Sequence, residues 1–160
     1  MEFNFEYAHP AGPVRARVTA RGVAAIVLPA PGVKKDGGAS AVSSPVARKL
    51  ARALERYFAG QRELFLDVPL DLETGTPFQR AVWLAARDIP WGSTATYGEL
   101  ARAVQCGSAR AVGQALGANP APIIVPCHRI LAAGGGLGGF SCGLEWKRRL
   151  LGLEKIEVQG

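Results

Sequence analysis

Hydrophobic and polar residues alternate in the first thirty positions with the two-residue period of a half-buried β-strand. Residues 14–19 (VRARVT) show this alternation, and an apolar run at 23–28 follows a tight turn at Arg21-Gly22. The pattern predicts strands between Phe3 and about Leu28, two of them joined as a hairpin. A further strand-like pattern extends from Leu64 to Leu72.

The apolar period changes to that of an α-helix after Ser44. Ser44 is a suitable N-cap, Pro45 suits the first helical position, and Gly60 ends the periodic segment. Residues 29–44 are rich in Pro, Gly, Ser and Lys, which predicts a loop whose Lys34-Lys35 pair is solvated. The first half is therefore a small α/β unit. The apolar face of its helix consists of Val46, Leu50, Leu54, Tyr57 and Phe58.

Three helical segments are predicted between residues 76 and 117. The motifs TPFQ (76–79) and TYGE (96–99) are capping boxes, in which a Thr hydroxyl and a Gln or Glu side chain bond free backbone amides. Ser108 can cap a third helix over 109–116, which Gly117 ends. The core-facing side of the first helix is predicted to carry Phe78, Val82, Ala85 and Ile89.

The second and third of these helices are joined by a tight turn at Cys106-Gly107, which makes them a helix-turn-helix candidate. The third helix is unusually slim, and Arg110 is its single charged side chain. A slim helix can approach another surface closely, but its small residues can equally pack against a neighbouring helix, so both interpretations stay open. The small residues are Ala109, Ala111, Gly113 and Ala115.

The chain is predicted to close with a glycine-rich loop over 132–139 and a helix over 144–153. The loop lacks the Gly-Lys-Ser/Thr of a phosphate-binding loop and does not stand between a strand and a helix as a dinucleotide motif would. Glycine allows a backbone to come close to a ligand. The basic residues Lys147, Arg148 and Arg149 of the helix are expected to be exposed.

Composition narrows the class of protein. The 160 residues carry a formal net charge of +6 and a pI of about 9.7, which is compatible with an anionic partner such as nucleic acid. Three widely spaced cysteines favour a reducing compartment over a disulfide framework, and two histidines without a Cys-x-x-Cys pair predict no zinc site. No apolar run is long enough to span a bilayer. We expect a soluble, cytoplasmic protein (nuclear in a eukaryotic source).

The candidate chemistry lies at residues 123–129 (IIVPCHR), where an apolar run and Pro126 precede Cys127. A thiol becomes nucleophilic when it loses its proton; nearby positive charge lowers its pKa, whereas apolar surroundings raise it. His128 and Arg129 offer the means of ionising the thiol, as a hydrogen-bonded base or as neighbouring positive charge, so the pattern predicts a reactive cysteine in a rigid pocket. The alternative is a small buried hydrophobe.

This segment resembles the active-site motif of the O6-alkylguanine-DNA alkyltransferases (methylated-DNA–protein-cysteine methyltransferases). The resemblance extends from about Thr76 to Glu154, whereas the first half matches only in outline. It implies a ribonuclease-H-like α/β domain over 1–74 and a mostly α, winged-helix-like domain with a helix-turn-helix over 75–160. The motifs that match are TPFQ (76–79), IPWG (89–92), TYGELA (96–101), RAVG (110–113), Asn119-Pro120, residues 123–129, GFS (139–141), Lys147 and Leu150-Leu151.

The resemblance implies a DNA repair protein that binds double-stranded DNA through the minor groove as a monomer, without cofactor, metal or membrane. It would flip O6-alkylguanine out of the duplex and transfer the alkyl group irreversibly to Cys127 in one turnover. His128 would take the thiol proton through a water, Glu154 would orient that histidine, and Asn119 would hold the turn. The implied substrate-binding residues are Tyr97, Arg110, Pro122, Arg129, Ile130, Phe140 and Ser141.

By the same resemblance, Arg110 would fill the space left by the extruded base and Tyr97 would press on the adjoining phosphate. Two departures from the family pattern stand out. Phe140 occupies a position where some members have tyrosine, which removes one hydrogen-bond donor. The first half has no cysteine, so the zinc site of some relatives cannot form there.

Three other readings remain open at this point. A lesion sensor of the alkyltransferase-like kind would bind alkylated DNA without repairing it, but such proteins lack the cysteine of this motif. A helix-turn-helix regulator would merely pack Cys127 in its interior. A Cys-His-Glu hydrolase would use the same side chains on a small acyl substrate and would turn over repeatedly.

Overall fold

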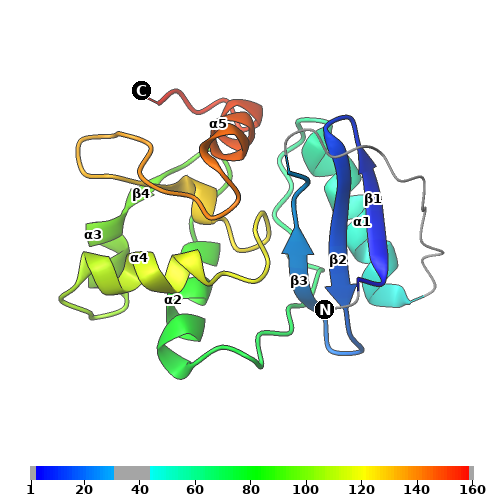
Figure 1. Ribbon diagram of the computed structural model, residues 1–160, viewed down its shortest axis with the longest axis horizontal. Coiled ribbons are helices and arrows are strands. Elements are labelled where there is room, and N and C mark those ends of the chain that lie inside the picture. Colours follow the sequence, from blue (N-terminus) through cyan, green and yellow to red (C-terminus); the bar gives the residue numbers. More distant parts are fainter. Residues whose placement is uncertain (1–2, 31–43, 159–160) are drawn as a thin grey trace. The chain divides into compact units, whose positions relative to one another are not determined.

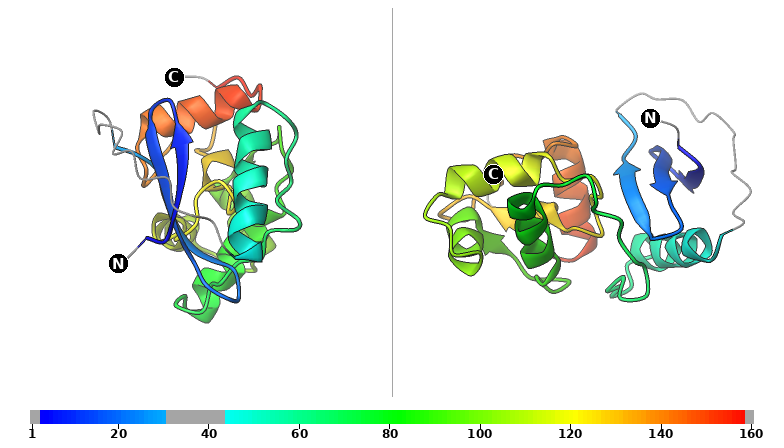
Figure 2. Two further views of the ribbon diagram at one scale, coloured as in Figure 1. Left: turned by 90° about the vertical axis from the view of Figure 1, so that its right-hand side faces the viewer. Right: turned by 90° about the horizontal axis from the view of Figure 1, so that it is seen from below.

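The computed structural model describes residues 3–30 and 44–158 and has a mixed α/β fold (Figures 1 and 2). It divides into two compact units, Met1–Leu72 and Glu73–Gly160. Most of the loop expected at 29–44, with Lys34-Lys35, lies outside the described residues. Within the described ranges, no helix combines the length and the apolar character needed to cross a membrane.

The first unit is a small antiparallel sheet with one helix against it (Figure 1). The strand order is β1-β2-β3, with Phe5 opposite Ala16 and Arg15 opposite Val27, so the predicted strands and hairpin are confirmed. Gly22 in the turn has a φ of +156°, and a Cβ there would lie 2.4 Å from the Pro69 carbonyl oxygen. The elements are β1 (Phe5–His9), β2 (Gly12–Val18), β3 (Val23–Val27) and α1 (Pro45–Phe58).

Helix α1 begins as predicted. The Ser44 side chain accepts a hydrogen bond from the Ala47 amide at 3.1 Å, which satisfies one of the amides left free at a helix start. Two apolar residues expected on the buried face, Val46 and Phe58, are only half-buried, and the Phe58 ring stacks on Tyr7 with centroids 5.6 Å apart. The fully buried side of α1 consists of Ala47, Leu50, Ala53, Leu54 and Tyr57.

The strand predicted over Leu64–Leu72 does not form. Phe65 has a φ of +53°, and this left-handed residue turns the chain, so the alternating apolar side chains do not share one face. Leu66 is consequently 82% exposed. Only a single bridge joins this segment to β3: the Val23 amide donates to the Pro69 carbonyl and the Asp71 amide donates to the Val23 carbonyl, both at 2.9 Å.

The second unit consists of short helices around a two-stranded parallel sheet (Figures 1 and 2). Strand β5 follows the cysteine segment directly and pairs with β4, with Ala95 opposite Ile130 and Thr96 opposite Leu131. This pairing places Cys127 close to the start of α3. The elements are α2 (Pro77–Arg87), β4 (Ala95–Thr96), α3 (Tyr97–Ala103), α4 (Ala109–Gly117), the 3-10 turn η1 (Cys127–Arg129), β5 (Ile130–Leu131) and α5 (Leu144–Leu153).

The predicted N-caps of these helices are confirmed. Both capping boxes form, with Thr76 and Thr96 accepting from the amides three residues on, and Ser108 caps α4. The predicted buried face of α2 is confirmed for Val82 but wrong for the other three residues, because Phe78 is 38% exposed and Ala85 and Ile89 are only half-buried. Trp83 and Ala86 are buried in their place. Trp83 turns inward because its indole N–H reaches the Ala115 carbonyl of α4 at 2.8 Å.

Candidate active site

Cys127 opens η1 and is only 5% exposed. Residues 121–125 before it are all buried, and the Cys127 amide donates to the Val125 carbonyl at 2.8 Å. The apolar run therefore holds the cysteine in one position, as its sequence predicts. Cys127 also lines a pocket between the α3–α4 pair and the segment 132–141. Other residues that line this pocket are Tyr97, Arg110, Gly113, Ala132, Phe140 and Ser141.

Asn119 holds the turn that carries the cysteine. Its Nδ2 donates to the Val125 carbonyl and to the Cys127 sulfur, each at 3.0 Å, and its Oδ1 accepts from the Ala121 amide at 3.0 Å. One side chain thus fixes both ends of the loop from 119 to 127. A donor that points at the sulfur favours the thiolate over the thiol.

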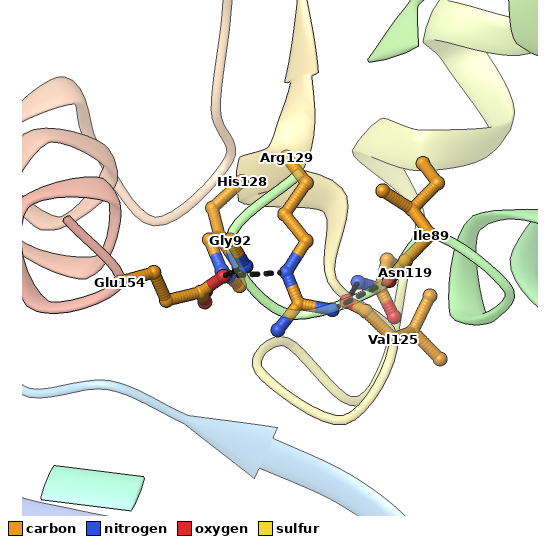
Figure 3. A network of polar contacts seen from close by, with 7 residues as sticks. All are labelled: Ile89, Gly92, Asn119, Val125, His128, Arg129 and Glu154. Carbon is orange, nitrogen blue, oxygen red and sulfur yellow. Dashed lines mark hydrogen bonds and ion pairs between the residues drawn. The ribbon is translucent and has the colours of Figure 1, made fainter. Parts of the chain in front are cut away.

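The two residues after Cys127, His128 and Arg129, form a buried polar cluster with Glu154 (Figure 3). The Nε2 atom of His128 is 2.5 Å from Oε2 of Glu154. The other carboxylate oxygen, Oε1, accepts from Nε of Arg129 at 2.7 Å and from the Gly92 amide at 3.2 Å. Arg129 also donates to the Ile89 carbonyl at 2.7 Å. The cluster joins η1, the end of α5 and the segment after α2.

Charges in this cluster are set by its contacts. Burial by itself raises the pKa of Glu154, but the hydrogen bonds and charges of His128 and Arg129 outweigh it and lower that pKa to about 2. Burial lowers the pKa of His128, and the positive charge of Arg129 lowers it further, against the opposing effect of Glu154. The site at neutral pH therefore holds an ionised Glu154 and a neutral His128.

The charges of His128 and Arg129 do not ionise the thiol in the resting protein, whereas a role of His128 as its base stays a prediction. Burial raises the pKa of Cys127 to about 12, although the Asn119 hydrogen bond and the charge of Lys147 act in the opposite direction. The Arg129 guanidinium donates its hydrogen bonds to Glu154 and to the Ile89 carbonyl rather than to the Cys127 sulfur. The thiol consequently stays protonated until a base removes its proton.

Lys147 is buried, which corrects its expected exposure; Arg148 and Arg149 are exposed as predicted. The Nζ atom of Lys147 donates to the carbonyls of Ile130 at 2.6 Å and Gly139 at 2.9 Å. Burial lowers its pKa to about 8, partly offset by Cys127. Lysine is rarely buried without such partners. Because Lys147 stands in a run of three basic residues, its burial was not expected. The signal that could have indicated it is the apolar period of the helix, which places Lys147 on the buried side.

The structure brings together four of the seven predicted substrate residues. Tyr97, Arg110, Phe140 and Ser141 line the pocket with Cys127. Tyr97 donates from its hydroxyl to the Gly139 carbonyl at 3.3 Å, and burial raises its pKa. The other three do not line the pocket and are buried: Pro122, Arg129 and Ile130.

Sequence reasoning missed the Gly92 amide, which donates a hydrogen bond to the Glu154 carboxylate. Gly92 has a φ of +82°, a conformation that favours glycine, and this backbone geometry presents the amide to the buried acid. The IPWG motif at 89–92 thus supplies two backbone contacts to the cluster, the Ile89 carbonyl and the Gly92 amide.

The fold and the site define a class of protein: a mixed α/β chain with one pocket cysteine backed by a buried histidine and glutamate. The family described as "6-O-methylguanine DNA methyltransferase, DNA binding domain" matches residues 77–156. A methylated-DNA–protein-cysteine methyltransferase of Haemophilus influenzae is 54% identical over 113 residues, which cover 70% of this chain and 63% of that protein. One of Methanosarcina acetivorans is 51% identical over 108 residues, covering 67% of this chain and 68% of that protein.

The crystal structure of Mycobacterium tuberculosis OGT in complex with DNA is similar along most of its length. It superposes with a TM-score of 0.77 at 40% sequence identity, and the alignment covers 94% of this chain and 91% of that one. The chain belongs to the methylated-DNA–protein-cysteine methyltransferase family.

Proposed function

We propose that this chain transfers an alkyl group from O6 of guanine in double-stranded DNA to the sulfur of Cys127, once per protein molecule. His128 takes the thiol proton through a bridging water, the sulfur bonds to the alkyl carbon, and the bond from that carbon to guanine O6 breaks. Guanine keeps the electron pair and gains a proton, so the base is restored. The thioether formed has no carbonyl for water to attack, and the protein is consumed.

The observation that carries this proposal is the setting of Cys127. Its side chain lines the pocket, its sulfur accepts a hydrogen bond from Asn119, and the adjacent His128 is bonded to an ionised Glu154. An ionised carboxylate only accepts hydrogen bonds, so Nε2 of His128 carries a hydrogen and Nδ1 keeps the lone pair that makes it a base. A merely packed cysteine would not require this arrangement.

The roles of the remaining residues follow from their positions. We propose that α3 and α4 are a helix-turn-helix within a winged-helix-like domain over 75–160, and that residues 1–74 form a ribonuclease-H-like domain. Helix α4 would enter the minor groove, because its small residues permit close approach. Tyr97, Phe140 and Ser141 would surround the extruded base. Three free cysteines, at 106, 127 and 142, fit a reducing cytoplasmic location.

Intact-mass measurement tests this function. After incubation with a duplex that contains O6-methylguanine, the protein is expected to gain one methyl group, located on Cys127, with one methyl transferred per molecule. The same duplex with unmodified guanine is the control. A hydrolase would show turnover on acyl substrates and no methyl gain, and a lesion sensor or a regulator would bind DNA without any change in mass. Either result would reject alkyl transfer.

Arg110→Ala is expected to slow repair of duplex DNA about tenfold or more, while reaction with free O6-benzylguanine stays nearly unchanged. Arg110 is exposed at the pocket on α4, where it can occupy the space that a flipped nucleotide leaves, and unstacking costs a few kcal/mol. The two rates are measured side by side. Arg52→Ala, which removes an exposed arginine of α1, is the matched control. Equal losses with both substrates would exclude the extrusion role.

A further inference from the structure

The charge of Arg129 is buried and paired within the protein. Its side chain is 7% exposed, and its guanidinium contacts Glu154 Oε1 and the Ile89 carbonyl, each at 2.7 Å (Figure 3). It does not line the pocket that contains Cys127. A basic residue two positions after the nucleophile is thus neither a DNA contact nor a direct partner of the sulfur.

The buried carboxylate of Glu154 needs this cation. An ionised carboxylate that is removed from water costs a great deal of free energy unless it is paired and hydrogen-bonded. With Arg129 present, the cluster of positive Arg129, negative Glu154 and neutral His128 has no net charge. If Arg129 were neutral, the same cluster would carry one negative charge, and binding one more proton would be the least costly way to remove it.

That additional proton would settle on the pair of His128 and Glu154, whose nearest atoms are 2.5 Å apart. It would either convert His128 to imidazolium or protonate Glu154. In both cases the pair can no longer accept the thiol proton readily. An imidazolium at His128 has no lone pair left, and a protonated Glu154 does not stabilise the imidazolium that forms when His128 takes up a proton.

We infer that Arg129 is a positioning residue that keeps Glu154 ionised and correctly oriented, so that His128 remains neutral in the resting protein and can accept the thiol proton. The inference rests on the proposed alkyl transfer and deepens it. Two further contacts support the orientation: Ile89 fixes the other side of the guanidinium, and the Gly92 amide bonds the same oxygen, Glu154 Oε1.

The charged and titratable groups around His128 come from two elements. Glu154, at the end of α5, favours its protonation, whereas Arg129 on η1 and Lys147 on α5 oppose it. Cys127 is adjacent on η1. Lys147 donates to the backbone carbonyls of Ile130 and Gly139, while Arg129 bonds the carboxylate itself. Arg129 is therefore the cation whose removal changes the charge balance of the pair directly.

Nitrogen-15 NMR of the imidazole rings tests the inference on the full chain without DNA. The protein has two histidines, so a His9→Gln variant assigns His128. Wild-type His128 is expected to remain neutral from pH 8 down to the acid unfolding range. In Arg129→Met the pair should bind one proton near neutral pH, and the acid limb of O6-benzylguanine reaction should move up by about one pH unit or more. Arg149→Met, which breaks an exposed pair with Glu145, should change neither.

Three results would overturn the inference. The first is a His128 that is already imidazolium at pH 7 in the protein with Arg129 intact; this measurement does not use Arg129→Met and holds even where that variant does not fold. The second is an Arg129→Met protein with the wild-type His128 spectrum. The third is an Arg129→Met rate that falls by the same factor at every pH. Failure of wild-type methyl transfer would reject the proposed function but leave the titration of His128 unaffected.

Discussion

Cys127→Ala is expected to abolish alkyl transfer completely and to leave binding of alkylated duplex DNA nearly unchanged. In the proposed transfer the sulfur of Cys127, which lines the pocket and accepts a hydrogen bond from Asn119, is the atom that forms the new bond. In the proposed binding mode, the duplex contacts exposed residues of α3 and α4 instead. Intact-mass measurement and a DNA-binding assay are applied to the same preparation.

The matched controls are the two other cysteines. Cys106→Ala and Cys142→Ala remove half-buried free thiols and are expected to leave the methyl gain in place. The Cys127→Ala protein should lose only about 1 kcal/mol of unfolding free energy, which is typical of a small truncation. Loss of DNA binding together with alkyl transfer would show that Cys127 is structural, and retained methyl gain would place the acceptor elsewhere.

Glu154→Ala is expected to destabilise the fold by about 3–5 kcal/mol, because it leaves Arg129 buried without its acid. It should also slow alkylation by roughly a hundredfold or more, since His128 loses the partner that orients and stabilises it. The thiol pKa in the presence of substrate should rise accordingly. Denaturant unfolding gives the first quantity, and the pH profile of O6-benzylguanine reaction gives the other two.

The pH dependence of stability offers a second measurement on Glu154. Its pKa is lowered from 4.5 to about 2 in the folded protein, so folding gains stability above the unfolded value and loses it as pH falls from about 4.5 toward 2. The stability difference between wild type and Glu154→Ala should therefore shrink across that range. Glu145→Ala, in an exposed pair at 3.5 Å, should cost under about 1 kcal/mol. An equal cost for both variants would contradict the buried cluster.

Local features of the fold were predictable because their causes are local. Ser44, Thr76, Thr96 and Ser108 each cap a helix through an amide three residues away, and the turn at Arg21-Gly22 joins neighbouring strands. Such contacts depend on a few adjacent residues, so a single sequence contains the information. The same holds for the cysteine segment, whose apolar run is buried as its composition indicates.

The incorrect predictions concern residues whose partners are distant in the chain. The buried face of α2 includes Trp83, whose indole N–H donates a hydrogen bond to the Ala115 carbonyl. Lys147 is buried because its ammonium donates to two carbonyls on other segments. Arg129 pairs with an acid 25 residues away rather than with the thiol beside it. Phe65 adopts a left-handed conformation that no periodic pattern announces. Tertiary packing decides the cases of Trp83, Lys147 and Arg129.

The carbonyl oxygen of Gly139 accepts two hydrogen bonds, one from Tyr97 on α3 and one from Lys147 on α5. A movement of this carbonyl would break both hydrogen bonds together and would leave the Lys147 ammonium bonded to the Ile130 carbonyl. Because Gly139 lines the pocket, this main-chain oxygen ties the pocket wall to two helices, and replacing a side chain at the rim leaves that link in place.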